Sequence, residues 1–107
     1  MTPKKRLNIL LADDGSQYAR PAVELVQSIP AQQRGRVLIL RAFDSAQISA
    51  RHEIEKALEG TARQLAGLGF KVEKDIQLSS PIELILTKAE VKKPDLIVMG
   101  SKGLHAT

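Results

Sequence analysis

The sequence of 107 residues contains no cysteine and no tryptophan, and it has only one tyrosine and two phenylalanines. The lack of cysteine excludes disulfide frameworks, thiolate zinc sites and cysteine nucleophiles, and it fits the reducing cytoplasm, where we expect the protein. No apolar run approaches the ~20 residues of a membrane-spanning helix. The apolar stretch at residues 7–12 follows a basic amino terminus but is too short for a secretory signal sequence.

Positive charge is only in modest excess, because 16 Lys and Arg stand against 12 Asp and Glu, which gives a net charge of +4. The basic residues are scattered and few aromatic rings are available to stack on bases, so a solvated basic surface is favoured over binding to nucleic acid. The apolar content of 43% is too high for a disordered chain, and the length indicates one compact domain.

Four segments have the composition of β-strands: residues 6–13, 36–43, 70–78 and 95–99. Three of them are almost continuously apolar, which is typical of strands covered on both faces. Residues 70–78 instead alternate between apolar and polar side chains, which predicts an edge strand with one face in water.

Helical patterns separate these strands, at residues 19–29, 45–68 and 80–93. The third has the clearest start, because Ser80, Pro81 and Glu83 have the spacing of a capping box with proline at the first helical position. Strand and helix alternation predicts an α/β fold with an open parallel sheet and right-handed crossovers. The expected buried face of the third helix consists of Ile82, Ile85, Leu86 and Ala89.

Ligands of open parallel sheets bind beyond the carboxyl ends of the strands. Asp13 and Asp14 follow the first strand, and a Gly-x-x-Gly pattern at residues 100–103 follows the last. Glycines allow backbone amides to approach phosphate oxygens, but the pattern alone also fits a tight turn. The two aspartates also fit a turn before Gly15, and their opposite directions on an extended chain do not predict a shared metal site.

The sequence offers no catalytic constellation, and we expect neither enzyme activity nor a metal site. His52 and His105 are separated from each other and from any carboxylate cluster, and no serine lies in a nucleophile-elbow pattern. The acidic pair Asp13-Asp14 and the strand at residues 94–99 also resemble parts of a phosphoacceptor receiver domain. Gly100, however, occupies the position where such a domain has its phosphorylated aspartate.

Three segments, residues 9–16, Ser80-Pro81 and residues 94–103, carry a family resemblance. In these segments the chain resembles the universal stress protein family, and the resemblance extends over essentially its whole length. Its most specific part is Asp-Leu-Ile-Val-Met-Gly-Ser-x-Gly at residues 95–103. The resemblance implies a Rossmann-like, adenine-nucleotide-binding fold with strand order 3-2-1-4-5. In this single domain of residues 1–107 we expect the order 3-2-1-4, with the fifth strand absent.

The resemblance also implies an adenine nucleotide site. It places Asp14 against the nucleoside, Ala12 and Asp13 beside it, and Ala42 at the adenine pocket. Gly100 and Gly103 match the first two glycines of the family's phosphate-binding pattern. The complete set of expected binding residues is Ala12, Asp13, Asp14, Ala42, Met99, Gly100, Ser101 and Gly103.

Two features predict weak or no binding of ATP, with AMP as the alternative ligand. The second half of the phosphate pattern is absent after Gly103, and two lost charge-assisted contacts amount to ~3–6 kcal/mol, roughly a hundred- to ten-thousand-fold in affinity. Asp13 adds a second carboxylate near a polyanion, at a cost on the order of 3 kcal/mol unless Mg²⁺ intervenes. We therefore expect Mg²⁺ only with a triphosphate.

The last strand, residues 96–99, is expected to form an exposed apolar edge, which is an aggregation hazard unless another chain covers it. We expect a homodimer along this edge and no membrane partner. Two functions remain open: a nucleotide-linked stress-response or signalling module, and a dimerisation or interaction module of the same fold without a nucleotide.

Overall fold

The computed structural model describes residues 5–15 and 19–100. Strands and helices alternate along them, as the apolar patterns predicted. Short 3-10 helices, η1 (Ala31–Gln33) and η2 (Ser45–Ala50), precede β2 and α2, so the helix expected at residues 45–68 begins with a 3-10 segment. The main elements are β1 (Leu7–Ala12), α1 (Ala19–Gln27), β2 (Arg34–Phe43), α2 (Arg51–Gly67), β3 (Lys71–Leu78), α3 (Pro81–Lys92) and β4 (Leu96–Met99).

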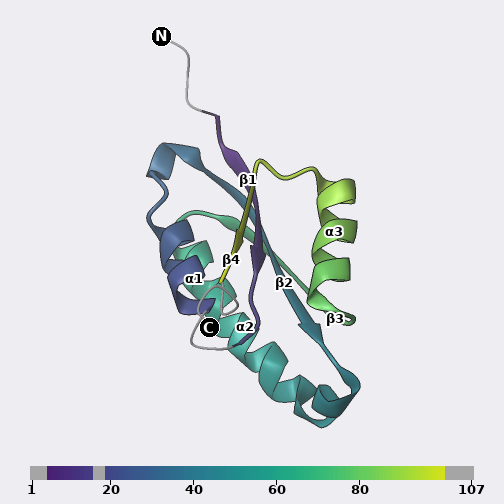
Figure 1. Cartoon of the computed structure of the whole chain (residues 1–107). Helices are drawn as coiled ribbons and strands as arrows, with labels where there is room; N and C mark the ends of the chain where they lie inside the picture. The colour runs from purple at the N-terminus through teal and green to yellow at the C-terminus, as the bar shows by residue number, and fades with distance from the viewer. Residues whose placement is uncertain (1–4, 16–18, 101–107) are drawn as a thin grey trace, which may run out of the picture.

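The four strands form one parallel sheet in the order β3-β2-β1-β4. This confirms the predicted α/β class and the predicted order, and it places the alternating strand β3 at an edge. Helices α1 and α2 cover one face of the sheet and α3 covers the other (Figure 1). Such a division follows when right-handed crossovers connect parallel strands in this order.

The two faces of the sheet bury very different amounts of apolar side chain. Twelve buried residues, among them Leu11, Val26 and Leu65, form the core between the sheet and the helices α1 and α2. On the α3 side only Leu10, Leu40 and Leu84 are buried. The second face is therefore much more thinly covered within the described part of the chain.

Helix α3 presents a different face to the sheet from the one that the sequence predicted. Leu84 is only 4% exposed, whereas Ile82 and Leu86 are 72% and 64% exposed. Apolar residues occur almost all round this helix, so the packing of Leu84 against Leu10 and Leu40 decides its rotation. The prediction that Ile82 and Leu86 are buried was wrong, while Ile85 and Ala89 are half-buried.

The start of β4 is fixed to β1 by Asp95. Its N–H donates to the Asn8 carbonyl, and its carboxylate accepts from Asn8 N–H, both at 2.8 Å. The Lys5 ammonium also donates to this carboxylate, and this bond, with the one from Asn8, holds the pKa of Asp95 below its ordinary value. These contacts set the register in which the carboxyl ends of β1 and β4 lie side by side.

The expectation that β4 is covered on both faces was wrong. Val98 is 5% exposed, but Leu96, Ile97 and Met99 are 37%, 43% and 49% exposed. Within the described residues β4 pairs only with β1, so its other backbone edge is unpaired. The predicted exposed apolar edge is therefore present in this part of the chain.

Candidate functional site

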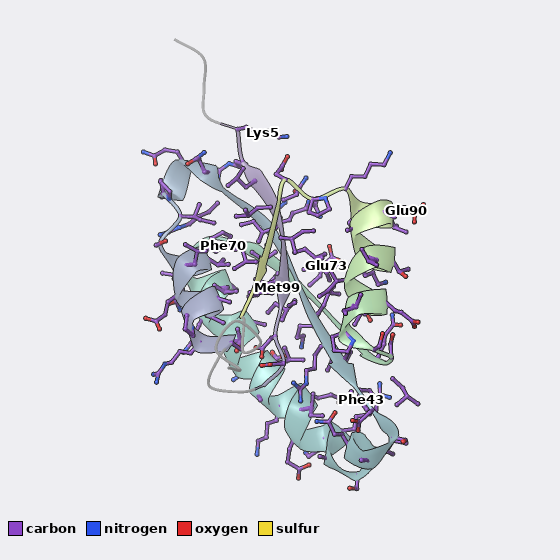
Figure 2. All side chains as sticks on the ribbon, viewed as in Figure 1. Lys5, Phe43, Phe70, Glu73, Glu90 and Met99 are labelled. Carbon is purple, nitrogen blue, oxygen red and sulfur yellow. The ribbon has the colours of Figure 1, made fainter. Side chains whose placement is uncertain are left out.

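The parallel register brings the ends of β1 and β4 together. Ala12 lies opposite Met99, so the residues that follow them, from Asp13 and from Gly100, start at the same edge of the sheet. Figure 2 identifies this carboxyl edge by Phe43, the last residue of β2, and the opposite edge by Lys5. The edge is the place where parallel sheets of this kind bind ligands.

A cavity of about 160 Å³ opens at this edge, on the α3 side of the sheet. We call it the β1–β4 cavity. Strand residues form one wall and the first turns of α3 form the other. Its lining residues are Ala12, Asp13, Asp14, Leu40, Ala42, Pro81, Leu84, Ile85, Met99 and Gly100.

The cavity combines apolar walls with acidic groups at one end. Leu40 and Leu84 are buried, and Ala42 and Ile85 pack against them, so this part can hold an apolar ring. Asp13 and Asp14 supply the only charged side chains among its lining residues. Such a site suits a ligand with an apolar ring and hydroxyl or amine donors, because the carboxylates accept hydrogen bonds.

A turn after β1 holds the first of these carboxylates. The Gly15 N–H donates to Asp13 Oδ1 at 2.7 Å, and Gly15 has a φ of 76°, in the region that glycine adopts without strain. The turn that the sequence suggested for Asp13 is thus present. It leaves Asp14 exposed at the mouth of the cavity.

The α3 wall is fixed by the start of the helix. Ser80 Oγ accepts from Glu83 N–H at 3.2 Å and Pro81 occupies the first turn, which confirms the predicted N-cap. The reciprocal bond of the predicted capping box, from Ser80 N–H to the Glu83 side chain, is not formed in the described structure. Because the helix starts here, Leu84 and Ile85 face the end of the sheet. The capping residues therefore position two of the residues that line the cavity.

Six of the eight predicted binding residues line this one cavity: Ala12, Asp13, Asp14, Ala42, Met99 and Gly100. The other two, Ser101 and Gly103, lie outside the described residues, as does His105. The sequence did not identify the contributions of Leu40, Leu84 and Ile85. The Ser-Pro start of α3 was a usable signal for the last two, since it fixes where that helix approaches the sheet.

Other kinds of site receive no support from the described residues. No group of three or more His, Asp or Glu side chains in residues 5–15 and 19–100 could hold a metal ion. His52 is exposed in the first turn of α2. None of the helices in the described ranges combines the length and the apolar character needed to cross a bilayer.

Residues 5–107 match the sequence model of the universal stress protein family. The chain belongs to this family. It is 32% identical over 108 residues to the universal stress protein in the QAH/OAS sulfhydrylase 3' region of Thermus aquaticus, an alignment that covers 92% of this chain and 79% of the relative.

Solved structures of similar proteins share the Rossmann-like universal stress protein fold. The structure of protein MJ0577 has a TM-score of 0.80 and 27% identity, and the match covers 94% of this chain and 78% of that one. The universal stress family protein At3g01520 of Arabidopsis thaliana, solved with AMP bound, has a TM-score of 0.71 and 20% identity. That match covers 92% of this chain and 79% of the other.

Proposed function

We propose that this universal stress protein domain is a cytoplasmic, non-enzymatic module that binds an adenine nucleoside or mononucleotide in the β1–β4 cavity. The observation that carries the proposal is the convergence of six predicted binding residues on that cavity. A second support is the fold shared with At3g01520, which was solved with AMP. We assign no catalytic residue.

The size of the cavity suits the base of such a ligand. Its volume of about 160 Å³ is close to the ~150 Å³ cavity that holds benzene in an engineered protein core. We place the adenine ring between Ala42 on β2 and Ile85 on α3. The ribose then lies at the mouth, where its hydroxyls donate to the carboxylate of Asp14, and the phosphate lies toward Gly100.

The negative charge of the cavity favours ligands with few phosphate groups. Two carboxylates and no cationic side chain line it within the described residues. Each extra negative charge at about 6 Å from a carboxylate costs on the order of 3 kcal/mol at an effective dielectric of 20, before screening by salt. We therefore propose that AMP binds at least about tenfold more tightly than ATP when Mg²⁺ is absent.

Isothermal titration calorimetry of the 107-residue chain tests this order. Adenosine, AMP and ATP are titrated with and without Mg²⁺, and GMP serves as the control for recognition of the base. The proposal expects binding of AMP, weaker binding of ATP that improves with Mg²⁺, and weaker binding of GMP. Tighter binding of ATP than of AMP without Mg²⁺, or no binding of any adenine compound, contradicts it.

A second function is supported by the apolar surface beside β4. Within the described residues the unpaired edge of β4 carries Ile97 and Met99, which are 43% and 49% exposed on the α3 side. Monomeric proteins seldom leave a flat apolar edge strand open, because it pairs with other chains. We propose that a second copy of the chain covers this surface, with the two β4 strands paired about a twofold axis.

A further inference from the structure

Arg41 is a charged side chain that the fold buries. It is 8% exposed and lies two residues before the end of β2. Its neighbours Leu40 and Ala42 lie on the α3 side of the sheet, so Arg41 points to the side of α1 and α2. The charged guanidinium is therefore largely shielded from water, with Nε fully buried.

The described residues give this charge no partner. Arg41 Nε is buried without a hydrogen bond, and no carboxylate in residues 5–15 or 19–100 forms an ion pair with the guanidinium. Asp13 faces the same cavity but accepts its hydrogen bond from Gly15 N–H. A buried, unpaired guanidinium is costly, so an anion that pairs with it binds favourably.

The Gly15 backbone covers one side of the guanidinium. A Cβ placed at Gly15 would lie 2.9 Å from Arg41 Nη1 and 3.1 Å from both Cζ and Nη2. The absence of a side chain at this position therefore gives Arg41 its room. The turn that starts at Asp13 thus shapes both faces of the sheet edge.

Arg41 borders a second cavity, of about 380 Å³, between α1 and α2. We call it the α1–α2 cavity. Val23, Ile54 and Leu58 give it apolar walls, and Thr61 and Gln64 add groups that form hydrogen bonds. Its size is within the ~300–1,000 Å³ range of small-molecule sites.

We propose that the α1–α2 cavity binds a small carboxylic acid anion with an apolar body, whose carboxylate pairs with Arg41. The guanidinium fork matches a carboxylate through two parallel hydrogen bonds. The apolar walls suit a short hydrocarbon body. Arg20, Asp13 and Glu53 also line the cavity, so with Arg41 its positive and negative side chains balance, and no excess of positive charge favours a phosphate dianion over a monoanion. This site is separate from the β1–β4 cavity and goes beyond nucleotide binding.

Hexanoate is the probe, titrated into the 107-residue chain with chemical shifts followed by NMR. We expect shifts of the Arg41 Nε–H signal and of the methyl groups of Val23, Ile54 and Leu58. Hexanamide has the same shape without the charge, and we expect it to bind at least about tenfold more weakly. Inorganic phosphate is expected to bind more weakly than hexanoate.

The deciding variant is Arg41→Met, with Arg36→Met as the control from an exposed position of the same strand. Arg41→Met is expected to weaken hexanoate about 10- to 150-fold. It is also expected to raise the melting temperature of the ligand-free protein, because an unpaired buried charge is removed. Arg36→Met should change neither. A purely structural role of Arg41 predicts the opposite, a lower melting temperature and no effect of hexanoate in either protein.

Arg41→Lys keeps the charge but not the fork, and we expect weakened but measurable binding of hexanoate. It decides the question if Arg41→Met does not fold. The proposal is overturned if hexanoate does not bind, if hexanamide binds equally well, if phosphate binds more tightly, or if the Arg41 variant that folds binds hexanoate unchanged. AMP affinity is measured in the same variants. If it is unchanged, the effect of the Arg41 substitutions on hexanoate is independent of the proposed nucleotide site.

Discussion

Arg41 and Ala42 are consecutive residues of β2, and they line cavities on opposite faces of the sheet. The alternation of side chains along a strand produces this arrangement. Asp13 is at the edge between the two cavities and lines both. One short stretch of sheet edge therefore borders two cavities with different linings, and a substitution in β2 can be directed at one cavity without the other.

Ala42→Leu is expected to block the β1–β4 cavity. The larger side chain extends into a space of about 160 Å³, so AMP affinity should fall roughly 5- to 150-fold, the equivalent of ~1–3 kcal/mol of overpacking. The measurement is calorimetric titration with AMP. Ala46→Leu is the matched control, because Ala46 is exposed on η2, and it should leave the affinity unchanged.

The same variant tests whether the two cavities are independent. The introduced leucine side chain would lie on the α3 side, so hexanoate binding in the α1–α2 cavity should be preserved. A loss of both ligands together would mean that the substitution distorts β2 as a whole. In that case Ala42 would not be assigned to the nucleotide site.

Ile97→Lys is expected to dissociate the proposed dimer. Ile97 is 43% exposed on β4, so a lysine there adds a charge to the edge that the two copies would share. Light scattering at tens of micromolar protein should report a dimer for the unsubstituted chain and a monomer for the variant. The control is Leu25→Lys, because Leu25 is 56% exposed on α1, on the opposite face of the sheet. A monomeric unsubstituted chain under these conditions refutes the dimer.

The pattern of strands was largely predictable because apolar composition and burial agree there. Continuous apolar runs gave β1 and β2, and the alternation from Val72 to Leu78 gave the edge position of β3. The rotation of α3 was not predictable, since Ile82, Leu84 and Leu86 are all apolar. A periodic pattern selects a buried face only when the opposite face is polar.

The lining of the β1–β4 cavity was more predictable than that of the α1–α2 cavity. The family resemblance identified six of its lining residues, from Ala12 to Gly100, before the structure placed them at one edge of the sheet. Nothing comparable marked Arg41. Arg41 interrupts the apolar run from Val37 to Phe43, which was a usable signal. Its isolation among buried groups depends on α1, α2 and the Gly15 turn, which are far apart in the sequence.

Ser80→Ala is expected to destabilise the protein by about 1 kcal/mol, the usual effect of removing a helix N-cap. Ser80 Oγ accepts the Glu83 N–H, and no second side chain caps this helix in the described structure. Urea unfolding measures the change. Ser79→Ala is the neighbouring control, because Ser79 Oγ only donates to the Ser80 carbonyl, and its effect should stay within about 0.5 kcal/mol. Equal losses in the two variants would contradict a capping role.

Asp75→Asn is expected to change how stability depends on pH. Burial raises the pKa of Asp75, but hydrogen bonds from Lys88 and Gln77, with the nearby charge of Lys92, outweigh it and leave the pKa below its ordinary value. The Lys88 ammonium lies 2.6 Å from the carboxylate and joins α3 to β3. The stabilisation is therefore fully present above the unfolded-state pKa of about 3.9 and is lost as the pH falls through the lower folded-state pKa.

Urea unfolding between neutral pH and about pH 2.5 measures this dependence. The variant should be less stable at neutral pH, and its stability should fall less steeply below about pH 4, so the two curves converge in acid. Glu90→Gln, at an exposed position on α3, should retain the steeper fall of the unsubstituted chain. Parallel curves for Asp75→Asn and the unsubstituted chain would mean that Asp75 titrates alike in both states. The acid sensitivity would then arise from other carboxylates with lowered pKa values, Asp95 and Glu59, of which Asp95 holds the start of β4.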